Sequence, residues 1–156
     1  MIKINNNGEN TMNAHHGFTT VGEASEFIFG GNATFTITSQ KTGKHFTYKV
    51  RQSDDGKMSF VSVLNGPDNW ENYMYIGFIP SAEVKLVAGK KGHPDAPSFN
   101  ALTWVFKILQ GSPEAELPAT VRIQHEGKCS MCNRKLTDPV SIERGVGPDC
   151  WSRRGQ

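Results

Sequence analysis

Alternation of apolar with polar residues recurs along the middle of the chain, in short runs separated by turn-forming residues. The runs cover residues 34–38, 45–50, 59–64, 73–79 and 83–87. A strand with one buried face shows this period of two, because its successive side chains point to opposite faces. Short turns between sequential strands favour hairpins. The pattern therefore predicts an antiparallel sheet of about five strands.

One helix is predicted after the sheet. Phe99, Leu102 and Leu109 recur there at helical spacing. Ser98 stands where an N-cap residue would, and Gly111 follows the run as a helix terminator. An apolar stripe of this kind usually packs on one face of a sheet. We therefore expect this helix to cover the predicted sheet.

Residues 1–30 are polar and rich in Asn, Gly, Thr and His, without a periodic apolar pattern. We expect them to form a flexible N-terminal segment, in which only residues 27–29 dock on the body that follows. Residues 31–118 hold the predicted sheet and helix, and residues 119–156 hold a cysteine-containing segment. At 156 residues the chain is long enough to bury a core without disulfides.

The charge and hydropathy of the chain exclude few classes of protein. The formal net charge of +2 neither requires nor excludes a nucleic-acid partner. No apolar run is long enough to cross a bilayer, and the N-terminus has no apolar stretch resembling a secretion signal. We therefore expect a cytoplasmic protein without a membrane partner.

All three cysteines, Cys129, Cys132 and Cys150, lie close together near the C-terminus. An odd number cannot pair completely within one chain, and the close spacing argues for a metal or for free thiols. Cysteines separated by two residues can place both sulfurs on one ion from a tight turn, and Cys150 can add a third. His125 lies just before Cys129 and would complete a tetrahedron. Mixed imidazole and thiolate ligands favour zinc.

Two alternatives to this interpretation stay open. Asp138 or Asp149 could replace His125 as the fourth ligand, although structural zinc sites prefer His and Cys. The two closely spaced cysteines could instead form a redox pair. A redox pair with this spacing normally opens a helix in a βαβ unit, whereas polar residues and a glycine precede the pair here. We therefore favour zinc.

Four protein ligands leave no open position for water, so the predicted site is structural rather than catalytic. The segment has few apolar residues of its own, and metal binding should therefore be coupled to its folding. The apolar residues expected to form a miniature core around the metal are Leu136, Val140, Ile142, Val146 and Trp151.

Residues 125–150 read His-Glu-Gly-x-Cys-x-x-Cys, then Leu-Thr-x-Pro-x-Ser-Ile, then Gly-x-Gly-Pro-x-Cys. This segment resembles a domain found in many uncharacterised bacteriophage proteins. Asn133 departs from the pattern, which usually has Gly there, but Asn also tolerates a left-handed backbone. Residues 42–48, 66–69 and 73–77 are less specifically similar to the region that precedes this domain. The resemblance implies a phage or prophage origin, and therefore the host cytoplasm, but no particular activity.

Basic residues surround and follow the predicted ligands, and they outnumber the acidic residues of the same stretch. They are Lys128, Arg134, Lys135, Arg144, Arg153 and Arg154. Lys and Arg in basic zinc modules often contact backbone phosphates. An ordinary solvated surface would have the same composition. We treat these residues as candidate contacts to DNA or RNA.

Aromatic residues on the predicted strands, with lysines nearby, offer a second candidate surface. The rings belong to Phe46, Tyr48, Phe60, Tyr73, Tyr75 and Phe78. Exposed rings beside basic residues would form a stacking platform for single-stranded nucleic acid. Alternation sends about half of such side chains into the core, which makes ordinary packing the stronger interpretation.

The sequence contains no catalytic triad, carboxylate pair or phosphate-binding loop that we would defend, so we expect neither an enzyme nor a small-molecule substrate. The expected fold is α+β, an antiparallel sheet of about five strands with one covering helix and a C-terminal zinc-binding module. The expected function is a non-enzymatic phage accessory protein that carries structural Zn2+ and binds nucleic acid. The alternative is an anti-CRISPR-like inhibitor that binds a protein of a host defence system, by analogy of origin alone.

Overall fold

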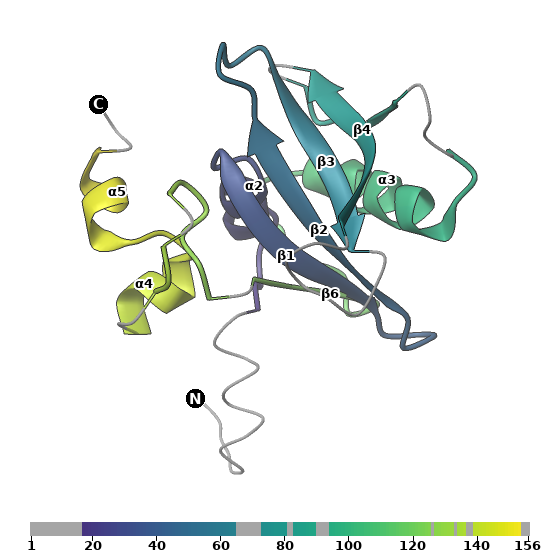
Figure 1. Cartoon of the computed structure of the whole chain (residues 1–156). Helices are drawn as coiled ribbons and strands as arrows, with labels where there is room; N and C mark the ends of the chain where they lie inside the picture. Colours follow the sequence, from purple (N-terminus) through teal and green to yellow (C-terminus); the bar gives the residue numbers. More distant parts are fainter. Residues whose placement is uncertain are drawn as a thin grey trace.

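A six-stranded sheet with helices on one face forms the body of the protein (Figure 1). The computed structural model describes residues 17–64, 73–80, 83–89, 94–125, 127–132, 134–136 and 139–153. The described strands are β1 (Asn32–Ser39), β2 (His45–Gln52), β3 (Met58–Leu64), β4 (Tyr73–Pro80), β5 (Val87–Ala88) and β6 (Val121–His125). All neighbouring strands are antiparallel, in the spatial order β5–β4–β3–β2–β1–β6. The antiparallel sheet predicted from alternation is therefore present.

The two edge strands differ from the prediction. β6 is an additional strand that pairs with β1, so residues 121–125 belong to the sheet rather than to the cysteine-containing segment. Its buried and less buried residues alternate, but five residues directly before a cysteine motif are a weak signal. β5 is only two residues long, and residues 83–86 of the predicted fifth strand have no regular structure.

Two helices, and not one, lie on the same side of the sheet (Figure 1): α2 (Val21–Ile28) and α3 (Pro97–Leu109). The expectation of a flexible segment is therefore wrong for residues 17–26, which are ordered, whereas residues 27–29 pack on the body as expected. Residues 1–16 lie outside the described part. A capping box begins α2, in which the Thr20 side chain accepts from the Glu23 amide and the Glu23 carboxylate accepts from the Thr20 amide. The helix then buries Phe27 and Ile28 completely, which explains why it is ordered.

The start of α3 also differs from the prediction. Ala96 occupies the N-cap position without a side-chain hydrogen bond, and Pro97 is the first helical residue. Proline is well suited to this position because its fixed φ is helical and it has no N–H to satisfy. Ser98 therefore lies inside the helix, where its carbonyl accepts a 2.7 Å hydrogen bond from the Tyr48 hydroxyl.

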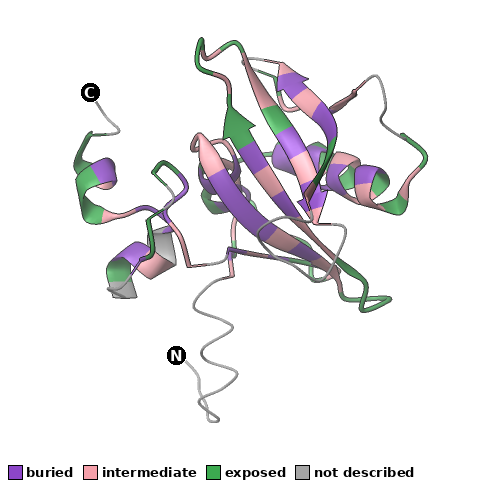
Figure 2. Cartoon of the chain, viewed as in Figure 1, coloured by how far each residue is buried: buried purple, intermediate pink, exposed green. Residues whose placement is uncertain are grey.

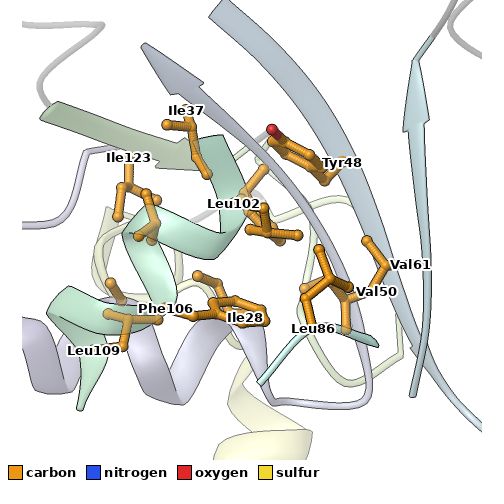
Figure 3. Packing of buried hydrophobic residues seen from close by; sticks show 14 of the residues in the cluster. Ile28, Ile37, Tyr48, Val50, Val61, Leu86, Leu102, Phe106, Leu109 and Ile123 are labelled. Atoms are coloured by element: carbon orange, nitrogen blue, oxygen red, sulfur yellow. The ribbon is translucent and has the colours of Figure 1, made fainter. Parts of the chain in front are cut away.

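The main hydrophobic core lies between the sheet and these two helices (Figure 2). Leu102 and Phe106 of α3 lie among Ile28 of α2 and the sheet residues Val50 and Ile123 (Figure 3). Each of these side chains is at most 2% exposed. Burying such side chains contributes roughly 1.5–3 kcal/mol each, so this layer dominates the stability of the fold.

Two short helices, α4 (Pro139–Arg144) and α5 (Pro148–Arg153), follow the sheet at the C-terminal end. They lie apart from the layer of α2 and α3 in Figure 1. No helix in the described part of the chain is long and apolar enough to cross a bilayer.

Candidate metal centre

The three cysteines come together although Cys150 is distant in sequence from the other two. Cys129 and Cys132 lie in the turn region after β6, and Cys150 lies in the first turn of α5. All three Sγ atoms lie within 4.8 Å of one another, and all three are free thiols. The structure therefore brings Cys150 next to Cys129 and Cys132, as their spacing predicted.

A small antiparallel turn holds the first two cysteines. Lys128 and Lys135 form an isolated β-bridge, and the Leu136 amide donates to the Gly127 carbonyl at 2.8 Å. The Cys129 amide donates to the carbonyl of Arg134, also at 2.8 Å. Gly127 has a φ of 80°, which a residue with a side chain rarely adopts. The local sequence therefore folds back on itself, with Cys129 buried and Cys132 exposed.

Backbone groups donate hydrogen bonds to the sulfur of Cys129. The Met131 amide donates to Cys129 Sγ at 3.4 Å. Burial alone would raise the pKa of Cys129, but hydrogen bonds from the backbone of Gly147, Cys132 and Met131 lower it below its ordinary value. Donors of this kind stabilise a thiolate, which is the form that binds a metal.

Cys150 is in the opposite situation. Burial, with hydrogen bonds and charge repulsion from Cys132 and Cys129, raises its pKa to about 11. Three thiolates this close together repel one another unless a cation lies between them. A bound divalent cation would supply that charge and would favour the deprotonated form of all three groups.

The residues present fit a thiophilic metal ion. In a tetrahedral zinc site with Zn–S distances of about 2.3 Å, the sulfur atoms lie roughly 3.8 Å from each other. This spacing is compatible with the three Sγ atoms observed here, which we call the sulfur group. The buried Cys129 and Cys150 and the amide donors to sulfur also fit a structural metal site. Among the described residues, no His, Asp or Glu adds a fourth ligand atom to this group. Asp138 lies outside the described residues.

A small core surrounds the cysteines, as predicted from composition. Leu136 and Val146 are buried with the thiols, and Ile142 and Trp151 pack against them. Val140 was expected in this core but is 58% exposed. This miniature core is separate from the main one, so the cysteines contribute much of its cohesion. We refer to residues 127–153 as the cysteine module.

His125 does not join the sulfur group, in contrast to its predicted role as fourth ligand. It is the last residue of β6 and is 3% exposed. Its Nε2 lies 2.6 Å from the Ile142 carbonyl, and its Nδ1 accepts from the Gly127 amide at 2.9 Å. Because a carbonyl can only accept, Nε2 carries the proton and the ring is the neutral Nε2–H tautomer. Both ring nitrogens are thus engaged by backbone groups of the cysteine module.

The same histidine joins the cysteine module to the body. Its ring stacks on Phe27 of α2, with centroids 5.1 Å apart, and lies 5.6 Å from the ring of Phe18. A Cβ added at Gly145, which follows α4, would overlap the Phe27 ring. The Asn32 amide donates to the Ser130 carbonyl at 2.6 Å. We call these contacts of Phe27, His125 and Gly145 the joint between the cysteine module and the body. The sequence did not predict the joint, because it depends on α2, which was not predicted.

Three of the predicted basic contacts lie beside the cysteines. Arg134, Lys135 and Arg153 line a cavity of about 210 Å³ that is also lined by all three cysteines and by Asp149. Arg153 Nη2 lies 3.8 Å from Cys150 Sγ. Asp149 also lines this cavity, but its carboxylate is not part of the group formed by the three Sγ atoms.

The other predicted basic residues are not among those that line this cavity. Lys128 is half-buried in the turn. Arg144 ends α4, and its side chain lies outside the described part of the chain, as does the whole of Arg154. Three of the four described basic side chains of the cysteine module, those of Arg134, Lys135 and Arg153, therefore lie in one small region next to the cysteines.

Comparison with known proteins gives one match. Residues 122–155 match the model of a family described only as a family of unknown function, DUF6011. The matched stretch includes most of β6, with His125, and the whole cysteine module. Neither a search of curated proteins nor a search of solved structures gave a match.

Proposed function

We propose that the cysteine module binds zinc through Cys129, Cys132 and Cys150, and that the module so stabilised binds the phosphate backbone of nucleic acid. The zinc is structural in this proposal, and the fourth ligand is solvent or a residue outside the described part. In the setting that the sequence resemblance implies, the protein is an accessory factor of a bacteriophage. It acts in the host cytoplasm without catalysing a reaction.

The observation that carries the proposal is the cavity at the cysteines. Arg134, Lys135 and Arg153 line it with three positive charges, and Asp149 provides the only carboxylate among the described lining residues. A zinc ion with three thiolates carries a net negative charge, which is not enough to neutralise these side chains. The region therefore suits an anion. Zinc would fix the backbone around Arg134 and Lys135, so that both side chains start from set positions.

Salt dependence of binding tests this proposal. We expect the protein to bind a labelled oligonucleotide with an affinity that falls steeply with salt, because phosphate contacts release counterions. The double variant Arg134→Ala/Lys135→Ala should bind every sequence more weakly. Its salt slope should be lower by about one for each phosphate that the variant no longer neutralises. Arg153 is left intact in this test because it lies next to a cysteine sulfur.

The matched control is Lys85→Ala/Lys107→Ala, which removes the same charge from exposed positions outside the cysteine module. Its salt slope should equal that of the wild type. Zinc content should be unchanged in both variants. If the wild type shows no salt-sensitive binding to single- or double-stranded nucleic acid, the proposal fails. The inhibitor of a host protein then becomes the function to test.

A further inference from the structure

One face of the sheet has none of the described helices on it. In Figure 1 both α2 and α3 lie behind the sheet, and the opposite face is turned towards the reader. We call this the open face. Strand alternation places Lys49 and Arg51 of β2 and Arg122 of β6 on it, since their neighbours Val50 and Ile123 are buried in the core. None of the residues in the described strands is Asp or Glu, so the open face carries only positive charge from its strands.

Large aromatic side chains lie on the same face. Phe60 of β3 and Tyr75 of β4 are 42% and 46% exposed, and their ring centroids are 6.3 Å apart in an edge-on arrangement. Phe78 pairs with Phe60 across the two strands. The Nζ atom of Lys49 lies 4.2 Å from the centroid of the Tyr73 ring.

Ordinary packing does not account for this exposure. Aromatic pairs across strands do stabilise sheets, and that role requires contact between rings rather than exposed ring faces. Tyr48 shows the contrast, because it is fully buried on the other face of the sheet. The aromatic residues singled out in the sequence are thus divided. Tyr48 is part of the core, whereas Phe60 and Tyr75 present nearly half of their surface to solvent.

We infer that the open face binds single-stranded nucleic acid, with bases stacked on Phe60 and Tyr75 and phosphates near Arg51 and Lys49. This inference rests on the proposed function, because it takes nucleic acid as the partner and specifies that the nucleic acid is single-stranded. Exposed rings offer stacking to any base, and adjacent cations follow the backbone. Arg51 pairs with Phe60 across β2 and β3, so a stacked base has a cation beside it. Bases in a duplex already stack on each other and cannot use these rings.

Removal of the two rings tests the inference. The double variant Phe60→Thr/Tyr75→Thr deletes the stacking surface and keeps a residue that favours strands. We expect its affinity for a labelled oligothymidylate to fall by about fivefold or more for each ring removed. Affinity for a duplex of the same length should stay within about twofold of the wild type, because backbone contacts carry duplex binding in this scheme.

Trp104→Ala provides the matched control. Trp104 is 43% exposed on α3, the helix on the covered side of the sheet, and its removal should leave single-strand affinity unchanged. Ultraviolet cross-linking of the wild type to oligothymidylate gives a measurement that needs no variant. Cross-linked peptides should contain Phe60 or Tyr75.

The outcomes separate this inference from the proposed function. If Phe60→Thr/Tyr75→Thr folds and binds oligothymidylate as the wild type does, or if cross-links occur only in the cysteine module, the open face is not the site. Weakened binding by Arg134→Ala/Lys135→Ala would then leave the proposed function intact. If the wild type binds neither single strands nor duplex, both proposals are wrong.

Discussion

His125 shows how a single residue can be placed by its strand rather than by its motif. Its position before Cys129 suggested a metal ligand, yet Val121, Ile123 and His125 alternate along β6 and face the core together. Its two nitrogens bind the carbonyl of Ile142 and the amide of Gly127. The imidazole therefore connects the sheet to the cysteine module without touching the sulfur group.

Replacing this residue distinguishes the two roles. His125→Ala should lower the free energy of unfolding by about 2–4 kcal/mol, because it removes stacking on Phe27 and leaves buried backbone groups unpaired. The metal content per chain should be unchanged. Elemental analysis and denaturant unfolding measure the two quantities, with His45→Ala as the control at an exposed position. Loss of metal from a variant that remains as stable as the wild type would restore His125 as a ligand.

The cysteine group itself was predictable at this scale, since Cys129 and Cys132 are local partners and Cys150 is the remaining thiol. The direction of the His125 side chain was not predictable, because the spacing between His125 and Cys129 does not say which face of a strand His125 occupies. Its period-two relation to Val121 and Ile123 was the available signal. The convergence of Arg134, Lys135 and Arg153 on the thiols depends on the fold of the turn and of α5.

At the scale of elements, α2 is the part of the fold that the sequence analysis missed. Its buried residues Val21, Ala24, Phe27 and Ile28 recur at helical spacing, but a helix of only eight residues makes that period a weak signal. The capping box of Thr20 and Glu23 was the signal at its start. The central strands were predictable because each alternates over seven or eight residues, whereas β5 has only two residues and the alternation of β6 covers only five.

Truncation measures what the start of this element contributes. A chain beginning at Val21 lacks the buried Phe18 ring, the Thr20 cap and the hydrogen bond from the Phe18 amide to the Ile123 carbonyl. We expect about 3 kcal/mol less stability, and therefore a melting temperature lower by roughly 6–12 °C. A chain beginning at Gly17 keeps all these interactions and serves as the reference. Equal melting temperatures for the two chains would show that the interactions do not stabilise the fold.

At the scale of the whole molecule, two cores of unequal size lie side by side. The larger lies between the sheet and its two helices, and the smaller is built on Leu136, Val146 and two of the cysteines. The joint at Phe27, His125 and Gly145 links them. The larger core does not depend on the cysteines, so loss of metal should affect the two parts differently.

Metal removal tests this division. The purified wild type should contain about one zinc per chain, and Cys132→Ser should lose it. Hydrogen exchange should then accelerate at residues 127–136 and 145–151, while β1–β4 stay protected. Met131→Ser, an exposed change in the same turn, should keep both metal and protection. Protein purified without chelator that contains no metal would contradict the zinc proposal, and loss of protection across the whole sheet would contradict the separation of the cores.

The strand order has a consequence for folding during translation. β1 is synthesised well before β6, yet its outer edge pairs with β6, which is translated only after α3. Until residues 121–125 have been added, that edge offers unpaired amides and carbonyls to any neighbouring nascent chain. Residues 40–120 must therefore be translated before β6 can pair with this edge of β1. In the zinc proposal, the cysteines that follow β6 would bind their ion only after this strand has been translated.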